Sequence, residues 1–250
     1  MNYTIMTHMV AAYPDEQRAL QVAKGLIDGG ASYLEVQFPF SDPTADGPVI
    51  QAACTQALAG GFTTEQGFAF IKIVAGMTSI PIFVMSYAAP VIHLGLSCYL
   101  ERLRDCGAAG CIVPDLPVGC DEGLYEYAGQ MGLSAVPVIA PNISKERLTA
   151  IVKTDPKYIY SALRAGITGS ITELTDENLA FLHRLQETEV KIFGGFGIRS
   201  QQQVAMLSSY IHASVVGSYF LEVLQDALER SSDIHDVIRS RLQNLITISE

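Results

Sequence analysis

Residues 33–48, YLEVQFPFSDPTADGP, show the pattern from which the fold class is predicted. Residues 33–36 form a short apolar run that predicts a strand, and a loop rich in proline and aspartate follows it. Residues 49–59 and 64–77, beyond the loop, have the apolar spacing of helices. A strand followed by helices predicts parallel pairing with the next strand, because a parallel crossover needs a long connection and usually a helix.

The same alternation continues along all 250 residues. Strands are expected at residues 3–10, 33–36, 80–85, 111–113, 135–139, 158–161, 191–193 and 214–216. Further helices are expected at residues 15–29, 95–106, 121–131, 144–153, 175–188, 200–208, 219–228 and 233–246. Eight strand–helix units with no change of composition between them predict one α/β domain over residues 1–250, a TIM (β/α)8 barrel. An open doubly wound sheet is the alternative, because periodicity does not reveal closure.

The amino-acid composition and the net charge argue against several classes of function. The chain is 49% hydrophobic and carries a formal net charge of −10, which opposes binding to nucleic acid or to an anionic membrane. No apolar stretch reaches the ~20 residues that span a bilayer. No basic segment precedes an apolar run near the N-terminus, so a cytoplasmic protein is expected. The five cysteines are scattered and are expected to be reduced thiols on core faces.

No cofactor and no metal are expected. No cluster of His, Asp and Glu has metal-ligand spacing, and no glycine-rich turn for a dinucleotide follows the first strand. Lys191 begins its strand rather than ending it, which disfavours an aldolase that works through a lysine Schiff base. His8 and His93 have no partner pattern, and a lone histidine is more often a packed or surface residue than a ligand.

Two carboxylates near the end of the second expected strand are candidates for acid–base chemistry. Glu35 lies between Leu34 and Val36 in the strand, so it points to the opposite face from both. If that face is the barrel interior, burial raises the pKa of Glu35 and suits it to proton transfer near neutral pH. An exposed strand glutamate or a structural ion pair is an equally good interpretation of the pattern. Asp46 follows in the loop, where a turn or a helix cap is the plainer interpretation.

Glycines follow three successive expected strands, in residues 163–169 (LRAGITG), 193–198 (FGGFGI) and 215–218 (VVGS). Barrels often bind phosphate with the loops after strands seven and eight, where glycine allows close approach and helix-start N–H groups are free to donate. Simple tight turns are the alternative for each loop. Together the three loops favour a phosphate site.

Five segments of the sequence together resemble a known family. Residues 34–51, 115–117, 164–169, 195–198 and 217–218 are similar, in order and in spacing, to the signatures of the tryptophan synthase α subunit. The resemblance implies a TIM-barrel lyase that splits indole-3-glycerol phosphate into indole and glyceraldehyde 3-phosphate. It also implies a tryptophan synthase β subunit as partner, in an α2β2 heterotetramer.

The resemblance assigns roles to individual residues. Glu35 matches the principal acid–base carboxylate, and Asp46 matches the carboxylate that interacts with the indole nitrogen. Residues 164–172 match a mobile loop that closes over substrate. The other implied positions are the pocket tyrosine Tyr160, the loop residue Thr168 that meets Asp46 on closure, the phosphate-binding Gly169, Phe196, Gly197, Gly217 and Ser218, the indole-pocket Met85, Ile112 and Val138, and the β-subunit contacts Pro39 and Asp42.

Several positions depart from the family pattern. Gln37 replaces a usual glycine, His8 a usual phenylalanine, and Ala89 a usual asparagine. Residues 11–14 replace a Thr-x-Gly-Asp-Pro stretch, and the helix that usually precedes the first strand is not expected here. The acid–base pair is intact. Three further functions stay open: a lyase that works alone and releases indole, a weakly catalytic subunit that activates its β partner, and another phosphate-binding barrel such as an isomerase, against which the Pro-Phe-Ser-Asp-Pro segment argues.

Overall fold

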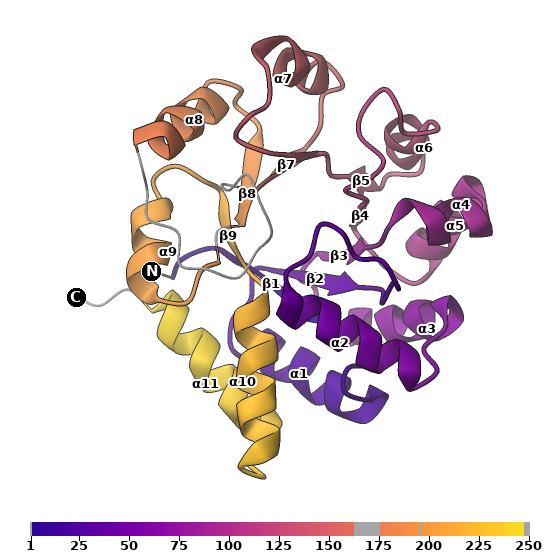
Figure 1. Cartoon of the computed structure of the whole chain (residues 1–250), viewed down its shortest axis with the longest axis vertical. Coiled ribbons are helices and arrows are strands. Elements are labelled where there is room, and N and C mark those ends of the chain that lie inside the picture. The colour runs from indigo at the N-terminus through magenta and orange to yellow at the C-terminus, as the bar shows by residue number, and fades with distance from the viewer. Residues whose placement is uncertain (1, 163–175, 196, 248–250) are drawn as a thin grey trace.

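The chain folds as a ring of helices around a parallel sheet, shown in Figure 1. The structure is a computed structural model that describes residues 2–162, 176–195 and 197–247. Its strands are β1 (Ile5–Val10), β2 (Tyr33–Gln37), β3 (Ile82–Met85), β4 (Gly110–Ile112), β5 (Ser134–Ala135), β6 (Val138–Ile139), β7 (Tyr158–Ala162), β8 (Lys191–Gly195) and β9 (Ala213–Val216). Every pairing between these strands is parallel, in the order β5-β4-β3-β2-β1-β9-β8-β7-β6.

The two ends of this order are pieces of one strand, so the sheet closes into an eight-stranded barrel. β5 and β6 are separated only by Val136 and Pro137. The Val136 N–H donates to the Cys111 carbonyl on one side at 2.9 Å, and the Pro137 carbonyl accepts from the Tyr160 N–H on the other side at 2.9 Å. One continuous strand over residues 135–139 was predicted. It is interrupted here because Pro137 has no N–H to give to a neighbouring strand.

Helices follow the strands as expected, with one addition. They are α1 (Glu16–Asp28), α2 (Pro48–Ala59), α3 (Thr64–Ala75), α4 (Ala88–Leu94), α5 (Leu96–Asp105), α6 (Leu124–Gln130), α7 (Lys145–Val152), α8 (Asp176–Gln186), α9 (Gln201–Leu207), α10 (Ser218–Glu229) and α11 (Ile234–Ile246). The short helix α4 was not predicted. It is separated from α5 by Gly95, whose φ of 87° breaks the helical path.

Alternation along the strands divides the apolar side chains between two cores. Leu34 and Val36 pack outward with residues of the surrounding helices, while Phe83 and Met85 belong to a second cluster inside the barrel. Glu35 therefore faces the interior, as its place between two outward-facing residues predicted.

Aromatic rings fill the end of the barrel at which the strands begin. Tyr158 and Phe193 stack with ring centroids 4.5 Å apart, and Tyr33 meets Phe193 edge-on at 4.9 Å. The Tyr33 hydroxyl lies 2.8 Å from Nε2 of His212, which satisfies both polar groups in this packed layer. Since these rings occupy the lower part of the barrel, space for a ligand lies at the opposite end, where the strands finish.

All five cysteines are free thiols, as expected. Cys54, Cys106 and Cys111 are buried, but Cys98 and Cys120 are exposed, so the prediction that all lie on core faces was wrong for these two. No helix in the described ranges is long and apolar enough to cross a membrane.

Candidate active site

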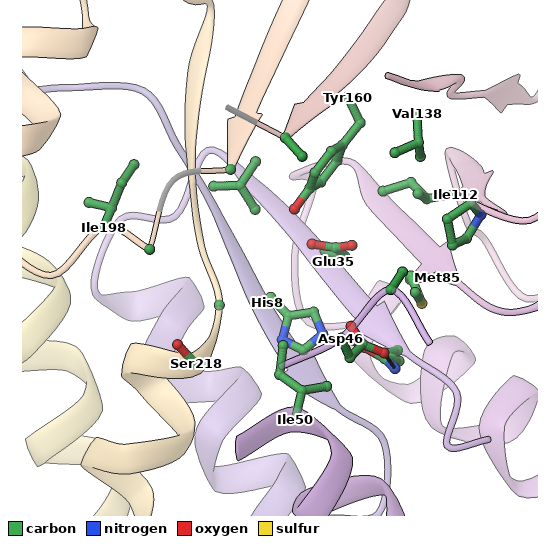
Figure 2. Close-up of a pocket in the computed structure, with 18 residues that line it drawn as sticks. His8, Glu35, Asp46, Ile50, Met85, Ile112, Val138, Tyr160, Ile198 and Ser218 are labelled. Carbon is green, nitrogen blue, oxygen red and sulfur yellow. Dashed lines mark hydrogen bonds between the residues drawn. The ribbon is translucent and has the colours of Figure 1, made fainter. Parts of the chain in front are cut away.

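A cavity opens where the strands end, and the predicted acid–base pair lies in its wall. Figure 2 shows Glu35 near the middle of the cavity and Asp46 to one side of it. The lining is mainly apolar, with a few polar groups. Its residues are His8, Glu35, Gln37, Ala45, Asp46, Ile50, Met85, Ile112, Pro114, Val138, Tyr160, Ala162, Gly195, Gly197, Ile198, Val215, Gly217 and Ser218.

Glu35 has the environment of a group that holds its proton near neutral pH. Its side chain is only 4% exposed. Burial, to which the charge of Asp46 adds, raises the pKa of Glu35 from 4.5 to about 7. In the described part of the chain no basic side chain forms a salt bridge with it. The structure thus contradicts the interpretation as an exposed glutamate, and it shows no ion pair for Glu35 among the residues it describes.

Tyr160 stands over Glu35 from β7. Figure 2 shows its hydroxyl directed toward the Glu35 carboxyl. Burial, together with the carboxyls of Glu35 and Asp46, raises the pKa of Tyr160 well above its ordinary value, so the hydroxyl keeps its proton. Gly195 makes room for the ring, since a Cβ there would lie 2.8 Å from the tyrosine oxygen.

Two hydrogen bonds hold one carboxylate oxygen of Asp46. The Tyr87 hydroxyl and the Gln37 side-chain amide both donate to Oδ2, at 2.8 and 2.7 Å. Burial raises the pKa of Asp46, although the hydrogen bonds from Tyr87 and Gln37 oppose that shift. Oδ1 receives no hydrogen bond from the residues described and is the oxygen left for a ligand.

Backbone groups on the opposite side of the cavity suit a phosphate. Gly217 immediately precedes α10, and Ser218 is the first residue of that helix. Gly197 follows β8 and has a φ of 64°, a conformation that favours glycine. The first N–H groups of a helix have no partner within the helix and carry the positive end of its dipole. The start of α10 can therefore bind an anion without a basic side chain.

The structure brings most of the predicted site residues to one cavity. Met85, Ile112 and Val138 form an apolar wall beside Glu35. Thr168, Gly169, Phe196 and residues 164–172 lie outside the described residues. Of the two predicted partner contacts, Asp42 is exposed on the loop after β2, whereas Pro39 is buried within the chain.

Two functional neighbours were missed from the sequence. Tyr87, whose hydroxyl donates a hydrogen bond to Asp46, lies just after the end of β3. A polar side chain at the end of a barrel strand is a candidate site residue, as Asp46 is, and this position was the available signal. His8 was interpreted as a lone histidine, but its Nε2 lies 2.8 Å from Oε1 of Gln37, 29 positions along the chain. Only the β1–β2 register, in which His8 pairs with Glu35, brings these groups together.

Within the described ranges, one group of side chains has metal-ligand geometry, and it lies outside the cavity. Asp233, His235 and Asp236 meet at the start of α11. Asp233 already caps that helix, and His235 lies 2.8 Å from a carboxylate oxygen of Asp28. These groups are therefore occupied by structural roles.

A barrel whose cavity at the strand ends holds a buried glutamate with a raised pKa and a hydrogen-bonded aspartate has the groups that acid–base enzymes use. A family model described as "Tryptophan synthase alpha chain" matches residues 2–246. The chain belongs to the tryptophan synthase alpha chain family, which makes it a lyase of tryptophan biosynthesis.

Individual relatives agree with the family model. The tryptophan synthase alpha chain of Helicobacter hepaticus is 36% identical over 234 residues, which cover 91% of this chain and 88% of the relative. A solved mutant alpha subunit from Pyrococcus furiosus is 27% identical, with a TM-score of 0.86 over 98% of this chain and 99% of that one. The solved tryptophan synthase complex from the same organism gives 26% identity and a TM-score of 0.85, over 98% and 99% of the two chains.

Proposed function

We propose that the chain cleaves indole-3-glycerol phosphate by a retro-aldol reaction into indole and glyceraldehyde 3-phosphate. The observation that carries the proposal is the buried Glu35, whose pKa of about 7 allows it to give and to take a proton in one cycle. The apolar wall of Met85, Ile112 and Val138 fits an indole ring beside that carboxyl.

The reaction needs two carboxyl groups with different duties. Protonated Glu35 gives its proton to C3 of the indole ring, and Oδ1 of Asp46 accepts the N1–H as positive charge develops there. The Glu35 carboxylate then takes the proton from the hydroxyl on the side-chain carbon attached to C3. The bond between C3 and that carbon breaks, its electron pair returns to the ring, and indole and the aldehyde result.

Phosphate binding supplies orientation. We assign the phosphate to Gly197, Gly217 and Ser218, which line the cavity. Figure 2 shows Ser218 on the other side of His8 from Asp46. Fixing the phosphate and the indole at opposite ends aligns the bond to be broken with Glu35, which lowers the entropic part of the barrier.

We also propose a tryptophan synthase β subunit as partner and the cytoplasm as location. The solved relative from Pyrococcus furiosus is a tryptophan synthase complex, and one of its chains resembles this one over almost the whole length. Asp42, exposed on the loop between β2 and α2, is our candidate contact, because that loop also carries Asp46. Movement of this loop on binding would reach the active site directly.

The decisive experiment is an assay of indole release from indole-3-glycerol phosphate by the native chain, Glu35→Gln and Glu101→Gln. Glutamine keeps the shape of Glu35 but cannot transfer the proton, so turnover should fall by a factor of about 10² to 10⁴. Glu101 is exposed on α5 away from the cavity, and its variant should match the native chain. Turnover by Glu35→Gln equal to that of the control would refute the role of Glu35.

The same assay with and without a β subunit separates the remaining alternatives. A rate that rises when β is added indicates a coupled lyase, and an equally high rate without β indicates a lyase that works alone. Near-zero turnover by the native chain in both conditions, with full activation of β, indicates a regulatory subunit and contradicts the proposal.

Gly217→Asp tests the phosphate site. A Cβ at Gly217 meets nothing closer than 3.7 Å, so the first atom of the new side chain fits. Repulsion between the new carboxylate and the phosphate should weaken inhibition by glycerol phosphate about tenfold or more. Gly129→Asp, which adds the same charge on the exposed face of α6, is the control. Equal inhibition constants for the two variants would place the phosphate elsewhere.

A further inference from the structure

The proposed reaction gives no role to the imidazole of His8, a polar group of the cavity wall. The side chain is 4% exposed, and its Nδ1 atom has no hydrogen-bond partner among the residues described. A buried polar atom without a partner is costly, and native structures avoid it unless a ligand or a water completes the bond. An unpaired atom of this kind on a residue that lines a cavity therefore points to a ligand.

A hydrogen-bonded chain fixes which ring nitrogen carries the proton. Oδ2 of Asp46 accepts, so the Gln37 side chain must direct its NH2 group there and its carbonyl oxygen toward His8. That oxygen can only accept, and Nε2 of His8 therefore donates to it at 2.8 Å. In the uncharged ring Nδ1 is then bare.

The bare nitrogen lies between the two ends of the proposed substrate site. Nδ1 is 3.8 Å from the place that a Cβ on Gly217 would occupy, beside the start of α10. His8 is also the register partner of Glu35 on the neighbouring strand. Figure 2 shows His8 between Asp46 and Ser218. A ligand that spans the acid–base pair and the helix start must pass this ring.

We propose that His8 binds substrate, with Nδ1 accepting a hydrogen bond from a hydroxyl of the three-carbon phosphate chain, and that Gln37 positions the imidazole for this contact. The inference rests on the proposed function, because the hydroxyl-bearing carbons are what joins the indole to the phosphate. The phosphate itself is a poor partner, since its oxygens and the bare Nδ1 are all acceptors.

Binding measurements in a Glu35→Gln background, where the substrate stays intact, test the contact. The ligands are indole-3-glycerol phosphate and 3-(indol-3-yl)propyl phosphate, which lacks both hydroxyls. His8→Phe keeps a flat ring without an acceptor and should lose about 3- to 10-fold in affinity for the first ligand and nothing for the second. His8→Asn places an amide oxygen near the position of Nδ1 and should recover part of the loss.

The outcomes distinguish a failure of the role of His8 from a failure of the proposed function. Equal losses for both ligands, or no loss for either, overturn the role of His8 while indole release by the native chain leaves the proposed function standing. If the native chain releases no indole and the Glu35→Gln background binds neither ligand, the proposed function fails and the inference fails with it.

Nitrogen NMR of the His8 ring tests the part assigned to Gln37. In the free native chain Nε2 should carry the proton and Nδ1 should be bare, whereas Gln37→Leu should give a mixture of the two tautomers. Gln130→Leu, on the exposed end of α6, should leave the native pattern unchanged. A proton on Nδ1 in the free chain, or one that appears when inorganic phosphate binds, would overturn the proposal in favour of a cationic contact to phosphate.

Discussion

Glu35 and Asp46 line the same cavity, but their neighbours differ. Burial raises the pKa of both carboxyls, but two hydrogen bonds to one oxygen of Asp46 oppose the shift there, and Glu35 accepts no such bonds from the described residues. The difference explains how two carboxyl groups in one cavity can act as a proton donor and as an acceptor for the indole N–H. It also makes Glu35 a source of pH-dependent instability.

The free energy of unfolding should fall as pH rises from about 4.5 to about 7, because of Glu35. In this window the unfolded chain has released the proton that the folded chain still holds at Glu35, so the unfolded state binds fewer protons. The loss amounts to roughly 3 kcal/mol, given the pKa shift from 4.5 to about 7. Glu35→Gln cannot ionise and should be more stable than the native chain at pH 8 by up to that amount, with little gain near pH 4.5.

Urea unfolding at several pH values measures this difference. Glu101→Gln is the matched control, because its carboxyl is exposed and its removal should give a difference that does not change with pH. A Glu35→Gln gain that is the same at pH 4.5 and pH 8 would show that Glu35 ionises normally in the folded chain.

At the scale of elements, the order of strands and helices was predictable, but details of backbone geometry were not. Periodicity placed every β-strand within a few residues and put Glu35 on the opposite face from Leu34 and Val36, but it left open whether that face is the barrel interior. Periodicity missed α4. The apolar spacing around Gly95 fits two helices separated by the glycine, but it fits equally well a single helix that begins at the glycine. The roles of Gln37 and His8 depended on register across two strands, which no local pattern encodes.

The end of α10 offers a stabilising change. Ser231 follows the helix with a φ of 52°, and the next N–H, of Ser232, donates to the Ala227 carbonyl at 2.9 Å. Glycine is favoured at this left-handed position because it has no Cβ to clash. Ser231→Gly should raise the free energy of unfolding by about 0.5–1 kcal/mol. Ser232→Gly, at a residue without positive φ, should lower it slightly, and urea denaturation distinguishes the two.

If both serine variants shift stability in the same direction, the left-handed strain is not what limits this helix end. The comparison is direct because the substitutions are chemically identical and one position apart.

At the scale of the whole molecule, closure of the barrel depends on the contact between β4 and β5. Gly110 pairs with Ser134 there, and a Cβ on Gly110 would lie 1.9 Å from the Ser134 carbonyl oxygen. Gly110→Ala must push the two strands apart and should cost more than about 3 kcal/mol of stability. Gly129→Ala, in α6 with nothing within 4 Å, should instead gain about 0.5–1 kcal/mol.

Denaturant unfolding of the two alanine variants checks this contrast, and circular dichroism shows whether Gly110→Ala still folds. A Gly110→Ala variant as stable as the native chain would mean that the barrel tolerates a gap at this contact.

The layer of rings around Tyr158, Phe193 and Tyr33 has a kinetic corollary. These side chains fill the barrel where the strands begin, so in the described part of the molecule the cavity opens at the end where the strands finish. Substrate and product then share that end of the barrel. An apolar product that leaves the cavity slowly blocks the next substrate molecule. Product release, rather than bond cleavage, then limits the turnover rate, unless another protein binds the product and removes it.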